Sequence, residues 1–218
     1  MFPVNLDLRG KLVLMVGAGR VGRRKLCKII AAGAKVRLVE PEPEAEIKLL
    51  VSEGRLEIHA VYGPELLDGV SLVFAATDKA PLNRIIAEEA RTKGLWTNIA
   101  DAPELSDFTL PAVVDHGLLQ LTVSTGGASP ALAARIADDL RLSYGPQYGT
   151  LAAVMAELRP MILSSGLDLP EREKIFKKLV NSPGLQKALV EKRKEPALNL
   201  LSELISPLTL PAGFKLPA

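Results

Sequence analysis

The sequence predicts an α/β protein in which a doubly wound parallel sheet is followed by a small α+β segment and then by helices alone. Three observations support this fold class. In the first half of the chain, apolar runs alternate with stretches of helical periodicity, which is the pattern of parallel βαβ units. From residue 108 the period changes, because two apolar runs flank a short turn. Beyond residue 145 only helical patterns remain.

The first part, residues 1–107, is predicted to hold a five-stranded sheet. Its strands are expected at the apolar runs 12–16, 35–39, 56–60, 72–76 and 96–100. Helices are expected directly after the first run, around 44–52 and at 81–93. The regular alternation predicts a parallel sheet covered by helices on both faces.

Two further parts complete the predicted organisation. Residues 108–145 are expected to form a hairpin with its turn at 115–117, followed by a helix that Ser129 caps and that runs from Pro130 to about Leu142. Residues 146–218 are expected to be helical. One helix is expected at 148–163, and three more are expected to begin at Pro170, Pro183 and Pro196. The tail from Pro207 is expected to be loosely held.

Composition excludes several classes of function. The 218 residues are 48% hydrophobic and 24% charged, with a formal net charge of +2 and no basic cluster of the kind that binds nucleic acid. No apolar run is long enough to cross a membrane, and a single cysteine indicates a reducing compartment, so a cytoplasmic protein is expected. That residue, Cys27, is predicted to be a buried structural thiol. His59 and His116 are far apart, which argues against a metal site.

A glycine-rich motif, Gly17-Ala18-Gly19-Arg20-Val21-Gly22, joins the first predicted strand to the first predicted helix. Gly17 permits a tight turn, Gly19 permits close approach of a diphosphate, and Gly22 permits close packing of helix on strand. The helix N-terminus adds free N–H groups and the positive end of its dipole. The motif therefore predicts a Rossmann-type dinucleotide site, although a strand-to-helix turn without a ligand would also use these glycines.

Three residues at strand ends extend the predicted cofactor site. Glu40 ends the second strand, about 20 positions past the glycines, where an acidic residue usually holds the ribose hydroxyls of NAD and disfavours NADP. Thr77 and Asp78 follow the fourth strand and either border the cofactor or cap the next turn. Arg20 and Val21 are counted as cofactor contacts, although Arg20 could equally solvate the helix.

The candidate catalytic residue is Asp101, which follows the fifth predicted strand. Ligands of open α/β sheets bind outside the carboxyl ends of the strands, so this carboxylate is expected to face the cofactor and to accept a proton. In the alternative interpretation, Asp101 is a turn former whose side chain bonds nearby backbone N–H groups. The residues alone do not separate these two interpretations.

Four sequence motifs resemble those of the precorrin-2 dehydrogenase and sirohydrochlorin ferrochelatase family, the N-terminal module of siroheme synthases. They are Gly17 to Gly22, Ala75 to Asp78 with Asn83, Asn98 to Pro103, and Ser124 to Pro130. The resemblance implies NAD-dependent oxidation of precorrin-2 to sirohydrochlorin and, in some members, insertion of ferrous ion to give siroheme. It also implies that Asp101 is the catalytic carboxylate and that subunits pair as a homodimer through residues 108–144.

The loop Ser124-Thr125-Gly126-Gly127 is a candidate substrate site, because its backbone N–H groups and hydroxyls can accept the carboxylates of a tetrapyrrole. Its glycines could instead serve only the turn before the helix. Two rival functions remain. A nucleotide-sensing module of a potassium-transport regulator would explain residues up to Glu40, and a small hydroxy-acid dehydrogenase would require a His or Lys acid-base residue in the second half of the chain.

Overall fold

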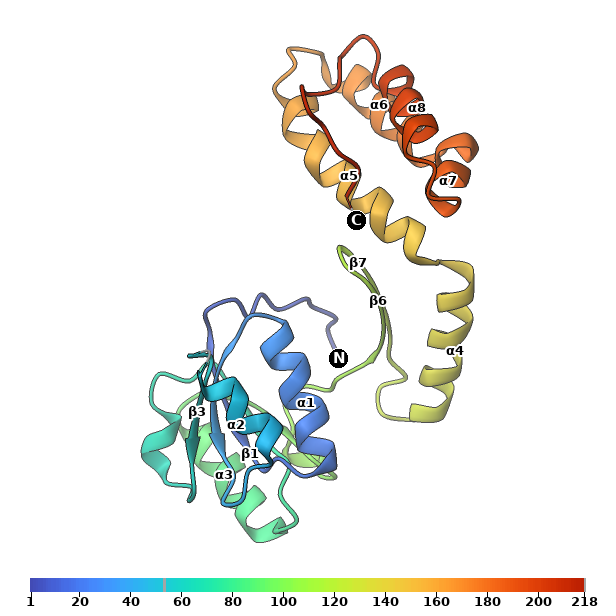
Figure 1. Cartoon of the computed structure of the whole chain (residues 1–218). Coiled ribbons are helices and arrows are strands. Elements are labelled where there is room, and N and C mark those ends of the chain that lie inside the picture. The colour runs from blue at the N-terminus through green and yellow to red at the C-terminus, as the bar shows by residue number, and fades with distance from the viewer. Residues whose placement is uncertain (53, 218) are drawn as a thin grey trace. The chain divides into compact units, whose positions relative to one another are not determined.

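The computed structural model describes residues 1–52 and 54–217. The chain divides into two compact units, Met1–Leu110 and Pro111–Ala218, each of which is described by itself. The first unit holds the parallel sheet, and the second holds a hairpin and a set of helices (Figure 1). The predicted α/β fold class is confirmed.

The sheet of the first unit has five parallel strands in the order β3-β2-β1-β4-β5. The strands are β1 (Leu12–Val16), β2 (Lys35–Val39), β3 (Leu56–His59), β4 (Leu72–Ala75) and β5 (Trp96–Ile99). The first strand, β1, lies in the middle of the sheet, β2 and β3 follow on one side of it, and β4 and β5 lie on the other side. The strand order therefore reverses between β1 and β4, and ligands of such sheets bind at this switch point.

Helices cover both faces of this sheet because successive strand residues point to opposite sides. The helical elements are α1 (Arg20–Ala31), α2 (Ala45–Ser52), α3 (Ala80–Thr92) and the 3₁₀ turns η1 (Pro64–Leu67) and η2 (Pro103–Leu105). Val13 and Met15 of β1 pack in one core with α1 and α2, which lie together over the sheet in Figure 1. Leu14 and Val16 pack in a second core with η1 and α3.

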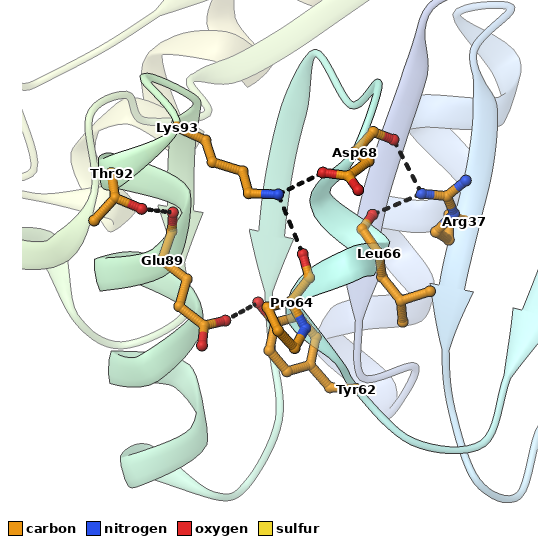
Figure 2. Close-up of polar contacts among 8 residues, drawn as sticks. All are labelled: Arg37, Tyr62, Pro64, Leu66, Asp68, Glu89, Thr92 and Lys93. Carbon is orange, nitrogen blue, oxygen red and sulfur yellow. Dashed lines mark hydrogen bonds and ion pairs between the residues drawn. The ribbon is translucent and has the colours of Figure 1, made fainter.

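A polar network ties η1 to the elements beside it (Figure 2). Arg37 of β2 donates from Nη1 to the Leu66 carbonyl at 2.8 Å, and Lys93 forms an ion pair with Asp68. Tyr62 donates its hydroxyl to Glu89 of α3 at 2.6 Å. The segment between β3 and β4 is thereby fastened to both the sheet and α3.

The second unit begins with an antiparallel hairpin, as predicted, but its turn is at Gly117 and Leu118 and not at 115–117, because Asp115 and His116 pair with the second strand. Its strands are β6 (Ala112–His116) and β7 (Leu119–Val123), and α4 (Pro130–Ser143) contacts both of them. The Ser129 side chain accepts a hydrogen bond from the Leu132 N–H at 3.2 Å, which is the predicted N-cap.

Four helices complete the second unit: α5 (Pro146–Leu163), α6 (Leu169–Val180), α7 (Pro183–Val190) and α8 (Lys194–Leu204). They share one apolar core that includes Leu158, Leu179, Leu185 and Leu201. The start of α5 also packs closely on the hairpin, because a Cβ atom on Gly149 would lie 2.1 Å from the His116 carbonyl oxygen. In the part of the chain that the structure describes, no helix is both long and apolar enough to traverse a bilayer.

Several local expectations are wrong. The tail from Pro207 is not loosely held. Four of its apolar side chains pack against the helical core, namely Leu208, Leu210, Phe214 and Leu216. Cys27 is exposed, since the buried side of α1 is formed by neighbouring apolar residues instead. The hairpin strand begins at 112 and not at 108, because Phe108 packs its ring edge-to-face on Phe74 in the first unit. Helix α8 begins at Lys194, two residues before the predicted proline.

Candidate functional site

The glycine-rich turn between β1 and α1 has a different steric demand at each glycine. Gly17 has φ +90°, and a Cβ there would lie 2.6 Å from the Ala76 carbonyl oxygen. A Cβ on Gly22 would lie 2.2 Å from the Gly17 carbonyl oxygen. Among the described residues, apart from the chain neighbours of Gly19, no atom lies within 4 Å of its Cβ position. Two glycines are therefore needed for the turn itself, whereas Gly19 faces open space.

The open space lies at the N-terminus of α1. Gly19 is the N-cap of this helix and supplies no side-chain hydrogen bond, so the first N–H groups have no partner within the helix. Arg20, Val21 and Arg24 line a cavity of about 260 Å³ at this end. A helix N-terminus with two guanidinium groups beside it fits an anionic diphosphate.

Glu40 lies against the same turn from the end of β2. Its carboxylate accepts hydrogen bonds from the Ala18 N–H at 2.7 Å and from the Glu42 N–H at 3.3 Å. The carboxyl ends of β1 and β2 are thus joined by a side chain, and the acidic group stands beside the glycines. The position agrees with a ribose-binding role, although the bond to Ala18 is not predictable from spacing alone.

Thr77 and Asp78 lie on the other side of the turn, after β4. The Thr77 hydroxyl donates to Asn83 Oδ1 at 2.7 Å and accepts from the Lys79 N–H at 3.1 Å, while Asn83 Nδ2 donates to the Thr77 carbonyl at 3.1 Å. Asn83 is buried. The Thr77 side chain therefore organises the start of α3, and Asp78 is exposed beside it. The backbone of Thr77 nevertheless borders Gly17, because its nitrogen is 3.0 Å from the Gly17 Cβ position.

Asp101 lies just past the carboxyl end of β5, at the same edge of the sheet as the glycine turn. It adopts φ 58°, in the left-handed region that Asp and Asn tolerate better than most residues. Its side chain is exposed, and no residue in the described ranges forms a hydrogen bond with its carboxylate. The interpretation of Asp101 as a turn former bonded to nearby backbone N–H groups is thus not the arrangement in this structure.

The segment around Asp101 is held by hydrogen bonds from side chains to which the sequence analysis assigned no individual role. Lys25 of α1 donates from Nζ to Asn98 Oδ1 at 2.7 Å, and Asn98 Nδ2 donates to the Phe108 carbonyl at 2.8 Å. Asp107 accepts from the N–H and the hydroxyl of Thr97 at 2.8 and 2.9 Å. No local signal predicts these bonds, apart from the polar residues that occur in an otherwise apolar strand.

The second candidate anion site belongs to the other unit. Gly126 and Gly127 have φ +64° and +89°, and in the described part of the chain no atom beyond their chain neighbours lies within 4 Å of either Cβ position. Thr125 Oγ1 accepts from the Ser129 N–H at 3.0 Å, and Ser124 Oγ accepts from the Gly126 N–H at 3.2 Å. The hydroxyls thus stabilise the loop, while its glycine backbone is exposed. Across the described residues, no group of three or more His, Cys, Asp or Glu side chains is placed to hold a metal ion.

Comparisons with known proteins agree with this geometry. A family model described as putative NAD(P)-binding matches residues 4–112, and one described as sirohaem biosynthesis protein central matches residues 117–141. A siroheme synthase of Methylobacillus flagellatus is 33% identical over 94% of this chain and 44% of its own length. A siroheme synthase of Chromobacterium violaceum is 36% identical over 84% of this chain and 39% of its own length.

A solved structure matches both units. SirC, a precorrin-2 dehydrogenase, superposes with a TM-score of 0.77 at 27% identity, over 94% of this chain and 98% of its own. The chain belongs to the siroheme synthase and precorrin-2 dehydrogenase family. The nicotinamide-binding class of the first unit follows from this membership and from the matching family model.

Family membership disfavours the rival nucleotide-sensing module, because the similarity continues through the second unit, beyond the glycine motif. The chain spans less than half the length of the two siroheme synthases. Of the predicted site residues, the structure brings the glycine turn, Glu40 and the backbone of Thr77 together around the end of β1. Asp101 lies at the same sheet edge, and the Ser124–Gly127 loop lies in the second unit.

Proposed function

We propose that this chain catalyses the NAD-dependent oxidation of precorrin-2 to sirohydrochlorin in siroheme biosynthesis. The observation that carries the proposal is the likeness to SirC, a precorrin-2 dehydrogenase, because it extends over 94% of this chain and 98% of that one. The glycine turn is independent support. It combines two sterically required glycines with open space at a helix N-terminus, which is what a dinucleotide diphosphate requires.

The oxidation removes a hydride and a proton from precorrin-2. When bound, NAD accepts the hydride and becomes NADH. The backbone of Gly17 to Gly22 holds the diphosphate, and Glu40 accepts hydrogen bonds from the ribose. Asp101 accepts the proton, which suits an exposed carboxylate at the carboxyl edge of the sheet. In the Ser124–Gly127 loop, the N–H of Gly127 binds a substrate carboxylate, since the Gly126 N–H already donates to Ser124 Oγ.

The preference for NAD over NADP is assigned to Glu40, since its carboxylate would repel a ribose phosphate. Glu40→Ala should weaken NAD binding roughly 10-fold, because it removes one or two hydrogen bonds to the ribose, and should weaken NADP binding less or not at all. Titration calorimetry with each cofactor measures this. An unchanged ratio of the two affinities would remove Glu40 from the site.

The name siroheme synthase of the relatives supports a second activity, the insertion of ferrous ion into sirohydrochlorin. Ferrous ion is then a substrate, and Asp101 would accept the protons that leave the pyrrole nitrogens. This extension is tested separately from the oxidation, because a dehydrogenase without chelatase activity would still satisfy the first proposal.

The deciding experiment is an anaerobic assay with precorrin-2 and NAD, in which sirohydrochlorin absorbance and NADH are followed together. Equal amounts of both products support the dehydrogenase. Subsequent addition of ferrous ion tests whether siroheme forms faster with protein than without it. Folded protein that produces neither sirohydrochlorin nor NADH would overturn the proposal, and unaccelerated metal insertion would overturn only the extension.

A further inference from the structure

Lys25 differs from the other basic residues near the start of α1. Arg20 and Arg24 are exposed, and Arg23 forms an ion pair with Glu44 in the following segment. Lys25 is partly buried, and its Nζ reaches across to Asn98 Oδ1 of β5 at 2.7 Å. About one helix turn past the proposed diphosphate site, α1 therefore directs a cation toward β5, the strand that precedes Asp101.

The surroundings of the Lys25 ammonium group contain little to compensate its charge. The Phe74 ring of β4 lies below it, 6.0 Å from Nζ to the ring centroid, and Asn98 is neutral. Burial lowers the pKa of Lys25, the negative charge of Asp101 raises it in part, and the positive charge of Arg24 lowers it further. The only carboxylate among these neighbours is the proposed catalytic one.

We propose that Lys25 is a positioning residue of the dehydrogenase site, whose ammonium group holds Asn98 and attracts Asp101, so that α1 and the end of β5 keep one mutual arrangement. The inference rests on the proposed function of Asp101. The hydrogen bond to Asn98 fixes the strand end, since Asn98 in turn donates to the Phe108 carbonyl at 2.8 Å. Asp101 follows Asn98 by three residues, so the bond from Lys25 fixes the strand end that leads to the carboxylate, and the positive charge of Lys25 attracts that carboxylate.

The arrangement affects the rate of the reaction, because it sets the position of the cofactor relative to the proton acceptor. The diphosphate of the cofactor would be held by the first turn of α1, while the proton acceptor follows β5. Both transfers concern the same substrate, and a misplacement of about 1 Å between such groups costs on the order of 10²-fold in rate. Lys25 joins α1, the helix that would bind the cofactor, to β5, the strand that precedes Asp101. It thereby sets the distance between the cofactor and the proton acceptor.

The electrostatic effect of Asp101 on Lys25 is measurable without substrate. In protein labelled with carbon-13 at lysine, the Lys25 side-chain signal, assigned from its loss in Lys25→Arg, should titrate at a lower pH than the exposed lysines. Asp101→Asn should move this titration to still lower pH, because the charge that favours the protonated amine is removed. Glu104→Gln, which removes an exposed charge three residues further along the chain, should leave it unchanged.

Kinetics test the role in the reaction. Lys25→Met should lower kcat on the order of 10²-fold with little change in the KM for NAD. Lys25→Arg should retain much of the activity, since it keeps the charge. Lysine loses its proton as the pH rises through its pKa, whereas arginine does not, so the alkaline decline in activity should move to higher pH in this variant. Lys28→Met, an exposed position on the same helix, is the matched control and should match the wild type.

The outcomes separate the two proposals. A Lys25 titration that does not respond to Asp101→Asn overturns the inference, whatever the assay gives. Wild-type kcat in Lys25→Met, with only a lower unfolding temperature, also overturns it and leaves Lys25 a structural residue. Wild-type protein that fails to oxidise precorrin-2 overturns the proposed function, while a Lys25 titration that shifts in Asp101→Asn would still establish the attraction between the two charges.

Discussion

At the scale of single residues, the glycines of the β1–α1 turn separate the demands of folding from those of binding. Gly17 and Gly22 have no room for a Cβ atom, whereas Gly19 has room and an extended backbone that other residues adopt, with φ −59° and ψ −178°. Gly17 and Gly22 are therefore required by the fold, whereas the missing side chain at Gly19 serves only to leave space for a ligand.

Gly19→Val should consequently weaken NAD binding while the fold survives. The valine side chain would fill the space beside the first N–H groups of α1, and the loss of one or two charge-assisted hydrogen bonds corresponds to roughly 10- to 100-fold in Kd. The N-cap change should cost about 1 kcal/mol of stability. Calorimetric titration with NAD and thermal unfolding measure the two effects.

Gly22→Ala is the opposite case and serves as the comparison. Its Cβ would approach the Gly17 carbonyl oxygen, so overpacking should cost about 1–3 kcal/mol in the free energy of unfolding. Equal NAD affinity of Gly19→Val and wild type would place the diphosphate elsewhere.

Asp101→Asn should reduce turnover and leave cofactor binding intact. Asparagine tolerates the left-handed φ of 58°, so the backbone should not change, but its amide cannot accept the substrate proton. The loss of a general base is typically ~10²- to 10⁴-fold in kcat. Steady-state kinetics with precorrin-2 measure this, with Glu104→Gln as the control. Undiminished kcat in folded Asp101→Asn would exclude Asp101 as the proton acceptor.

At the scale of elements, the β3–η1–β4 segment depends on side chains more than on its own short helix. Tyr62, Lys93 and Arg37 join it to α3 and to the sheet (Figure 2). Burial, followed by the hydrogen bond to Glu89, raises the pKa of Tyr62 well above the ordinary tyrosine value. The neutral phenol is therefore the form that the folded state requires.

The pH dependence of stability follows from this shift. Above about pH 10 the unfolded chain releases the Tyr62 proton while the folded chain retains it, so unfolding becomes more favourable as the pH rises. Tyr62→Phe should lose about 1 kcal/mol at neutral pH, from the missing hydrogen bond. In this variant the free energy of unfolding should also fall less steeply above about pH 10. Urea unfolding of both proteins from neutral pH to pH 11 measures the difference, and parallel curves would contradict the assignment.

At the scale of the whole molecule, the second unit exposes apolar side chains that its own packing does not use. On α4, Leu132 and Ile136 lie one turn apart and are 51% and 38% exposed, and Leu142 is 87% exposed. One side of this helix already packs on the hairpin. We infer that the other side forms the interface of a homodimer, which would bury these residues.

Sedimentation at micromolar concentration should therefore give a dimer. Leu132→Glu combined with Ile136→Glu should shift it to monomer, because two buried carboxylates without partners oppose association. Leu169→Glu, at an exposed leucine of α6, should leave the dimer unchanged. A wild-type monomer under these conditions would exclude this interface.

What the sequence determined by itself is local in origin. Hydrophobic periodicity placed all five parallel strands, and the glycine motif was recognised from six neighbouring residues. The cap at Ser129 followed from a side chain that bonds an N–H three residues away. Such features depend on contacts within one turn or one strand, so residue types at short spacing are sufficient to predict them.

The tertiary structure alone decided the features that join distant segments. Lys25 and Asn98 are 73 residues apart, Ala18 and Glu40 are 22 apart, and neither pair has a local signature. The tail without a period is held because the helices leave apolar surface for Leu208 and Phe214 to cover. These side chains do not determine the local secondary structure. Their partners depend on the strand order and on the helix packing, which bring distant segments together.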